Sequence, residues 1–148
     1  MKKPKKKWSG TDLKVFRATY SLYGNAISKV LHDIESGILV LPQGKSIFYN
    51  DAVVRRLGNT QRKGQLQKDL DSRFDNILRR LRMEFPGFTK RQLRLFSYIA
   101  ADLPDYLIYK LLHLPSEDMV YQMKKKMLAK IMYTACKYRD EYIAMLDN

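Results

Sequence analysis

Three consecutive lysines, Lys124 to Lys126, lie inside the otherwise apolar stretch VYQMKKKMLAKI, and their side chains are the ones in this sequence best suited to binding chemistry. Their ammonium groups bind anions, above all the phosphates of nucleic acids and of lipid headgroups. Neighbouring side chains on a helix point about 100° apart, so these three lysines cannot all face one partner. A helix with one core-facing stripe accommodates them, and that stripe consists of Val120, Met123, Met127 and Ile131.

The side of this helix that faces away from the stripe is polar and basic. It carries Lys124 and Lys126 on its two flanks and, opposite the core, Tyr121, Gln122, Lys125 and Ala129. Such a face can bind a polyanion, and it can equally be an ordinary solvated surface. The sequence of this helix alone leaves both interpretations open.

Other residue types that perform chemistry lack the necessary spacing. The segment Gly44–Ser46 resembles the end of a phosphate-binding loop, but Leu39 occupies the position of the glycine that such a loop requires. His32 and His113 lie in separate segments, so the sequence contains no metal-ligand spacing. No serine or cysteine stands beside a suitable base. We therefore expect no enzyme activity and no cofactor.

Composition points to an anionic partner. The chain has 148 residues, of which 45% are hydrophobic, and this suits one domain with a sizeable core. Lys and Arg number 28 against 15 Asp and Glu, a formal net charge of +13, which favours nucleic acid or a lipid surface. No stretch approaches the roughly 20 apolar residues of a membrane span. The one cysteine, Cys136, sits in a helical pattern as a small buried hydrophobe and suits a reducing compartment, so we expect a cytoplasmic protein.

The first 65 residues divide into a tail and a helical segment. Residues 1–10 form a basic tail that ends in a linker at Trp8–Gly10. A long helix opens at Thr11 and Asp12 and ends at Gly37, because its apolar positions recur at alternating spacings of three and four. Residues 38–49 predict a small β-hairpin, and residues 51–57 predict a short helix. The segment 11–65 is therefore helical with one hairpin.

Residues 66–148 predict a helix-turn-helix-like domain with a long C-terminal helix. A long basic helix over 66–85 stops at Pro86. Thr89 with Gln92 forms a capping box for the next helix. A short helix follows over 105–112, and Ser116 caps the lysine-bearing helix, which runs on towards residue 146 without glycine or proline. The predicted fold is all-α, a helical bundle with a C-terminal helix-turn-helix unit and at most one small β-hairpin.

The stretch FPGFTKRQLRLFSYIAADLPDYLIYKLLHLPSEDMVYQMKKKMLAKI resembles the DNA-binding domain of LuxR-type (GerE-like) regulators. It is most similar to a bacterial subgroup that carries this helix-turn-helix at the C-terminus, behind helical sensor segments. The resemblance covers roughly residues 70 to 135. The positions that match the family's motifs are Thr89, Gln92, Tyr98, Ile99, Leu103, Ile108, Leu111, Leu112, Val120, Met127, Lys130 and Ile131.

This resemblance implies a transcriptional regulator, or its DNA-binding portion, that reads double-stranded DNA with helix 117–131. Tyr121, Gln122 and Lys125 would face the groove, and Lys124, Lys126 and Lys130 would lie near phosphates. Cations around the preceding helix junction would extend these contacts, and they are Arg91, Arg94, Arg79, Arg80, Arg82 and Lys90.

The sequence departs from the family pattern at four kinds of position. Asp102 replaces a usual turn glycine, the following turn is one residue longer, and Met123 and Ala129 replace common basic residues. Glu117 and Asp118 open the recognition helix, where their carboxylates repel phosphates. These departures favour an alternative function, in which a degenerate helix-turn-helix serves protein interaction or dimerisation without DNA binding. A homodimer would form through the stripe within residues 13–34 or through the C-terminal helix.

Overall fold

Every regular element of the described residues is an α-helix. The computed structural model describes residues 8–36 and 65–147, and the all-α prediction is confirmed for this part of the chain. The hairpin predicted over 38–49, the helix predicted over 51–57 and most of the basic tail lie outside the described residues. The helices are α1 (Gly10–Glu35), α3 (Gln65–Arg73), α4 (Ile77–Glu84), α5 (Lys90–Ala100), α6 (Asp105–Leu111), α7 (Asp118–Tyr133) and α8 (Arg139–Leu146).

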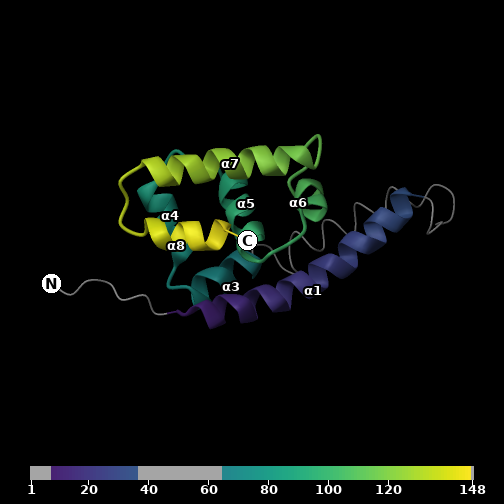
Figure 1. The fold of residues 1–148 in the computed structure, drawn as a ribbon, viewed down its shortest axis with the longest axis horizontal. Helices are drawn as coiled ribbons and strands as arrows, with labels where there is room; N and C mark the ends of the chain where they lie inside the picture. Colours follow the sequence, from purple (N-terminus) through teal and green to yellow (C-terminus); the bar gives the residue numbers. More distant parts are fainter. Residues whose placement is uncertain (1–7, 37–64, 148) are drawn as a thin grey trace.

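The helices pack around α5. Figure 1 shows α7 along one long edge of the molecule and α1 along the opposite edge, with α5 between them. Helix α8 runs antiparallel beside α7 and also packs on α5. Buried side chains of α1 and of all the later helices belong to one hydrophobic cluster. The outward side of α7 is therefore turned away from α1.

The capping box at the start of α5 is confirmed. The Gln92 backbone N–H donates to Thr89 Oγ1 at 3.1 Å, and the Thr89 backbone N–H donates to Gln92 Oε1 at 2.7 Å. These two bonds satisfy backbone donors that a helix start leaves unpaired. The six residues from Leu95 to Ala100 are all buried, so the second half of α5 forms the centre of the core.

The prediction of a linker at Trp8–Gly10 is wrong, because these residues form the start of α1 and the segment just before it. Trp8 is only 5% exposed, and its ring packs edge-on against Phe74 with centroids 5.2 Å apart. Ser9 is the N-cap, since the Asp12 N–H donates to Ser9 Oγ at 3.3 Å and the Ser9 N–H donates to the Asp12 carboxylate at 2.7 Å. The helix therefore starts at Gly10, one residue earlier than the apolar pattern indicates, and Trp8 belongs to the core.

Helix α1 is fixed to the rest of the bundle by the guanidinium of Arg17. Its Nε donates to the Ala100 carbonyl at 3.1 Å, and its Nη2 donates to the Met145 carbonyl at 2.9 Å. These carbonyls belong to the C-terminal ends of α5 and α8, where helices lack internal donors and favour a positive charge. Gly24 allows close approach in the middle of α1, because a Cβ there would lie 2.6 Å from a Leu103 methyl carbon.

The C-terminal end of α1 is held by α6. Glu35 accepts hydrogen bonds from the Tyr106 hydroxyl and the Lys110 ammonium, and the His32 ring stacks on Tyr106 with centroids 3.5 Å apart. Phe16, in the stripe expected to form a dimer, is buried by this chain alone. A homodimer through that stripe stays a prediction, and the structure gives α1 a partner within its own chain.

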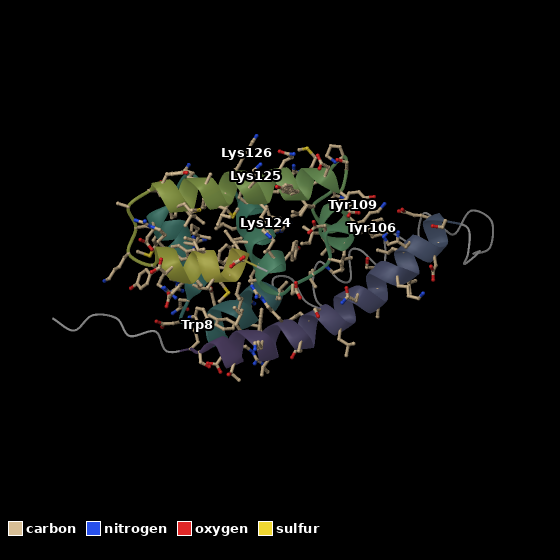
Figure 2. All side chains as sticks on the ribbon, viewed as in Figure 1. Trp8, Tyr106, Tyr109, Lys124, Lys125 and Lys126 are labelled. Atoms are coloured by element: carbon tan, nitrogen blue, oxygen red, sulfur yellow. The ribbon has the colours of Figure 1, made fainter. Side chains whose placement is uncertain are left out.

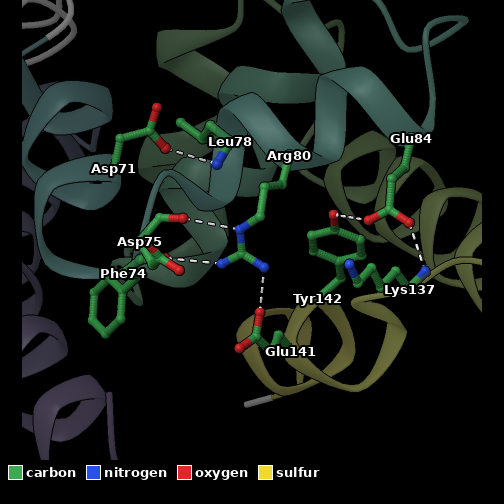
Figure 3. A network of polar contacts seen from close by, with 9 residues as sticks. All are labelled: Asp71, Phe74, Asp75, Leu78, Arg80, Glu84, Lys137, Glu141 and Tyr142. Atoms are coloured by element: carbon green, nitrogen blue, oxygen red, sulfur yellow. Dashed lines mark hydrogen bonds and ion pairs between the residues drawn. The ribbon is translucent and has the colours of Figure 1, made fainter. Parts of the chain in front are cut away.

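The prediction of one long helix over 66–85 is wrong, because two residues with a left-handed backbone conformation divide this segment into α3 and α4. Asp75 has φ 56° and Asn76 has φ 58°, a conformation that aspartate and asparagine tolerate better than most side chains. The Asp71 carboxylate then accepts from the Leu78 N–H at 2.7 Å at the start of α4 (Figure 3). The predicted apolar positions are nevertheless all buried, and they are Leu66, Leu70, Phe74, Ile77, Leu78, Leu81 and Phe85.

Arg80 stabilises this break, as Figure 3 shows. Its Nε donates to the Asp75 carbonyl at 2.9 Å, and its Nη2 donates to the Phe74 carbonyl at 3.0 Å. Its Nη1 forms an ion pair with Glu141 of α8, and the guanidinium carbon lies 4.2 Å from the centre of the Tyr138 ring. One side chain therefore connects the end of α3, the start of α4 and α8.

The prediction of one continuous C-terminal helix is also wrong, because α7 ends at Tyr133 and the chain then reverses direction into α8. Thr134 is extended, with φ −110° and ψ 132°. Glu84 holds the turn from α4, since it accepts from the Lys137 backbone N–H at 2.6 Å and from the Tyr142 hydroxyl. Cys136 lies in this turn, half-buried and outside a helix, where burial raises the pKa of its thiol.

The turn between α6 and α7 differs from the predicted cap. Ser116 makes no side-chain cap; its backbone carbonyl accepts from the Met119 N–H at 3.2 Å, and Glu117 is the N-cap residue. His113, just after α6, has φ 54°. Asp102, after α5, has φ 59°, a left-handed conformation that aspartate tolerates better than most side chains.

Replacing His113 with glycine is expected to raise the free energy of unfolding by about 0.5–1 kcal/mol, because glycine adopts positive φ without steric cost. Urea denaturation of the variant measures the change. Ala129→Gly, at an exposed helical position, is the matched control and should lower stability by about 1 kcal/mol. A loss of stability in His113→Gly comparable to the control would contradict the left-handed assignment.

Candidate nucleic-acid interface

The predicted core stripe of α7 is confirmed. Val120, Met127 and Ile131 are buried, and Met123 is half-buried beside them. Because the stripe occupies one side, the opposite side of α7 faces solvent. The exposed residues on that side include Tyr121, Gln122, Lys125, Lys126 and Ala129.

The lysines of α7 divide between the outer face and its two flanks. Figure 2 shows Lys125 and Lys126 on the outer side of the helix, and Lys124 on its inner side towards the bundle. Lys124 is accordingly half-buried. Lys130 lies on the flank opposite Lys124, as the 100° spacing of helical side chains requires. The helix thus presents polar groups at its centre and a cation on each side.

Two of these ammonium groups lie over aromatic rings. Lys125 Nζ lies 5.6 Å from the centre of the Tyr121 ring, and Lys130 Nζ lies 5.4 Å from the centre of the Phe88 ring. Such cation–π contacts contribute about 0.5–1 kcal/mol at exposed sites. Phe88 belongs to the turn between α4 and α5, so Lys130 connects the end of α7 to the start of α5.

Arg91 and Arg94 are exposed on the first half of α5. Arg94 lies one helical turn before Ser97, whose hydroxyl accepts from Gln67 of α3 at 2.8 Å. This bond places Arg94 near the side of α5 that packs on α3. Arg80, which the sequence also suggested for phosphate contacts, is occupied by the Glu141 ion pair and by two backbone carbonyls. That suggestion is wrong for Arg80.

The N-terminal turn of α7 is acidic. Glu117 and Asp118 are both exposed, and Glu117 makes no side-chain cap bond. Burial, the hydrogen bond to Glu35 and the charge of Glu117 all raise the pKa of the Tyr106 hydroxyl. Glu117 therefore lies close enough to α6 for its charge to act there.

Two exposed residues of the outer face were missed by the sequence analysis. Tyr133 is 87% exposed and Met132 is 47% exposed at the C-terminal end of α7. They lie next to Ile131 in sequence but point away from the core stripe, so the same 100° spacing that placed the lysines was sufficient to find them. With Tyr121, they make the outer face partly apolar.

Comparison with protein-family models, with curated proteins and with solved structures gives no match. Within residues 8–36 and 65–147, no group of His, Cys, Asp or Glu side chains has the arrangement of a metal site. None of the helices described is both long and apolar enough to span a membrane.

Proposed function

We propose that this chain is the DNA-binding portion of a transcriptional regulator, with α7 as its recognition helix in double-stranded DNA. The carrying observation is the outer face of α7, which is exposed, basic and rich in hydrogen-bond donors, while its opposite side is anchored in the core. The succession of α5, α6 and α7 supports this proposal, since a helix-turn-helix unit likewise ends with its recognition helix. Such a regulator acts in the cytoplasm of a bacterium.

The dimensions of a helix suit this role. The major groove of B-DNA is about 12 Å wide and admits a helix about 10–12 Å in diameter. Gln122 and Lys125, near the centre of the outer face, match adenine and guanine edges respectively. Lys126 and Lys130, both exposed, suit the phosphates beside the groove.

The double variant Lys125→Ala/Lys126→Ala is expected to weaken binding to a random-sequence DNA duplex by about tenfold or more at low salt, because two exposed cations are lost without a change in the core. Fluorescence anisotropy measures the dissociation constant. Lys14→Ala/Lys68→Ala is the charge-matched control, since both lysines are exposed on α1 and α3. Equal weakening by the two double variants would show that only net charge matters.

A second candidate function is protein interaction, and the exposure of Tyr133, Met132 and Tyr121 on the outer face favours it. Large apolar groups gathered on one surface mark interaction sites in many proteins. Binding through an apolar helical surface changes little with salt, whereas DNA binding weakens steeply. Salt dependence therefore discriminates between the two functions.

A further inference from the structure

The two ends of α7 carry opposite charge. Glu117 and Asp118 form the exposed acidic turn at the start, while in the second half Lys130 lies on one flank and Lys126 lies between that flank and the outer face. Asp118 and Lys130 are 12 residues apart, which corresponds to about 18 Å along a helix axis. That separation exceeds the Debye length of about 8 Å at physiological ionic strength, so the two ends act on a ligand independently.

The basic flank continues from α7 onto another element. Lys130 Nζ lies over the Phe88 ring, and a Cβ at Gly87 would be 3.7 Å from this nitrogen. Gly87 and Phe88 form the turn that leads into α5. Lys90 and Arg91 are exposed in the first turn of α5, two and three residues after Phe88. Three cations from two helices, Lys130, Lys90 and Arg91, therefore lie close to one turn, and Lys126 lies one helical turn before Lys130 on α7.

We infer that one DNA strand runs along this basic flank, defined as Lys126, Lys130, Lys90 and Arg91, and that the acidic turn of α7 stays outside the groove. This inference rests on the proposed function and deepens it by fixing where the phosphates lie. Helix-turn-helix proteins usually contact bases with the N-terminal residues of the recognition helix. Here that end carries two carboxylates, so the centre and the second half of α7, together with the α4–α5 turn, make the contacts with DNA.

The position of the strand predicts which substitutions change binding. Each phosphate neutralised contributes about −0.9 to the slope of log K against log salt concentration. Removing Lys90 and Arg91 together should reduce the magnitude of the slope by about 1.8, although neither residue lies on the recognition helix. Asp118→Asn should change affinity by less than about twofold, because the acidic turn lies beyond the screening distance from the phosphates.

The experiment measures anisotropy of a labelled random-sequence duplex across a salt series for the full chain. The variants are Lys90→Ala/Arg91→Ala, Lys126→Ala/Lys130→Ala and Asp118→Asn, with Lys14→Ala/Lys68→Ala as the control. Thermal unfolding of each variant checks that Lys130→Ala leaves the fold intact. We expect both basic-flank variants to lose slope equally, and the control and Asp118→Asn to match the parent.

The possible results separate this inference from the proposed function. A parent protein that binds DNA, combined with an unchanged slope for Lys90→Ala/Arg91→Ala, overturns the basic flank and leaves recognition by α7 standing. Tightening of more than about fivefold by Asp118→Asn overturns it as well, since the acidic turn would then face phosphates. A parent protein that shows no salt-dependent binding to the duplex overturns the proposed function itself.

Discussion

Replacing Arg80 with alanine is expected to lower the free energy of unfolding by about 3–5 kcal/mol, the usual cost of removing one partner from a buried ion pair. The side chains of Arg80 and Glu141 are only 14% and 15% exposed, so Glu141 would keep a charge that little water can solvate. The carbonyls of Phe74 and Asp75 would also lose their donors at the break between α3 and α4. Urea denaturation measures the loss.

Arg82→Ala is the matched control for this prediction, because Arg82 is an exposed arginine on the same helix. Exposed surface substitutions usually change stability by less than about 0.5 kcal/mol. Arg80→Lys should recover only part of the loss, since an ammonium cannot reproduce the planar set of donors that reaches two carbonyls and a carboxylate. Equal stabilities for the alanine variants of Arg80 and Arg82 would contradict the role assigned to Arg80.

Replacing Met127 with alanine is expected to lower the free energy of unfolding by about 2–5 kcal/mol. Met127 is 1% exposed and lies on the side of α7 that packs against the core. Its truncation removes apolar contacts and leaves a cavity in the core that the surrounding helices fill only in part. Thermal or urea unfolding of the purified variant measures the effect.

The neighbouring substitution Lys126→Ala provides the contrast, because Lys126 is exposed on the same helix. It should leave stability within about 0.5 kcal/mol of the parent and weaken DNA binding. Met127→Ala should lower stability, whereas the molecules of this variant that remain folded should bind DNA like the parent. If Lys126→Ala destabilised the protein as much as Met127→Ala, the orientation of α7 would be wrong.

Local sequence signals predicted most of the helices. The Thr89 and Gln92 capping pair gave the start of α5 correctly, because both of its bonds lie within four residues. The apolar stripes of α3, α4 and α7 were predicted because core-facing positions repeat with the helical period. The start of α1 was missed by one residue, and the burial of Trp8 was missed because Phe74, on which it packs, lies far along the chain.

The helix breaks depended on distant partners. The break between α3 and α4 is held by Arg80 together with Glu141, and the turn after α7 is held by Glu84. No local pattern reveals such contacts. The adjacent Asp75 and Asn76 were the one local signal for the first break, because both residue types accept a left-handed backbone.

The candidate site was partly accessible from sequence. The outward direction of Lys125 and Lys126 followed from helical spacing, since it needs only the position of the core stripe. The contact of Lys130 with Phe88 could not be predicted from helical spacing, because it depends on how the turn between α4 and α5 packs beside α7. The contacts of Arg80 with Glu141 and with two backbone carbonyls could not be predicted either, because they also depend on tertiary packing.

The salt dependence of binding to a random-sequence duplex tests the central claim most directly. If α7 is a recognition helix, its lysines neutralise phosphates, and a plot of log K against log salt concentration should fall with a slope steeper than about −3. That value corresponds to between three and four phosphate contacts at about −0.9 each. A slope near zero, or no binding at low salt, would contradict DNA recognition by α7.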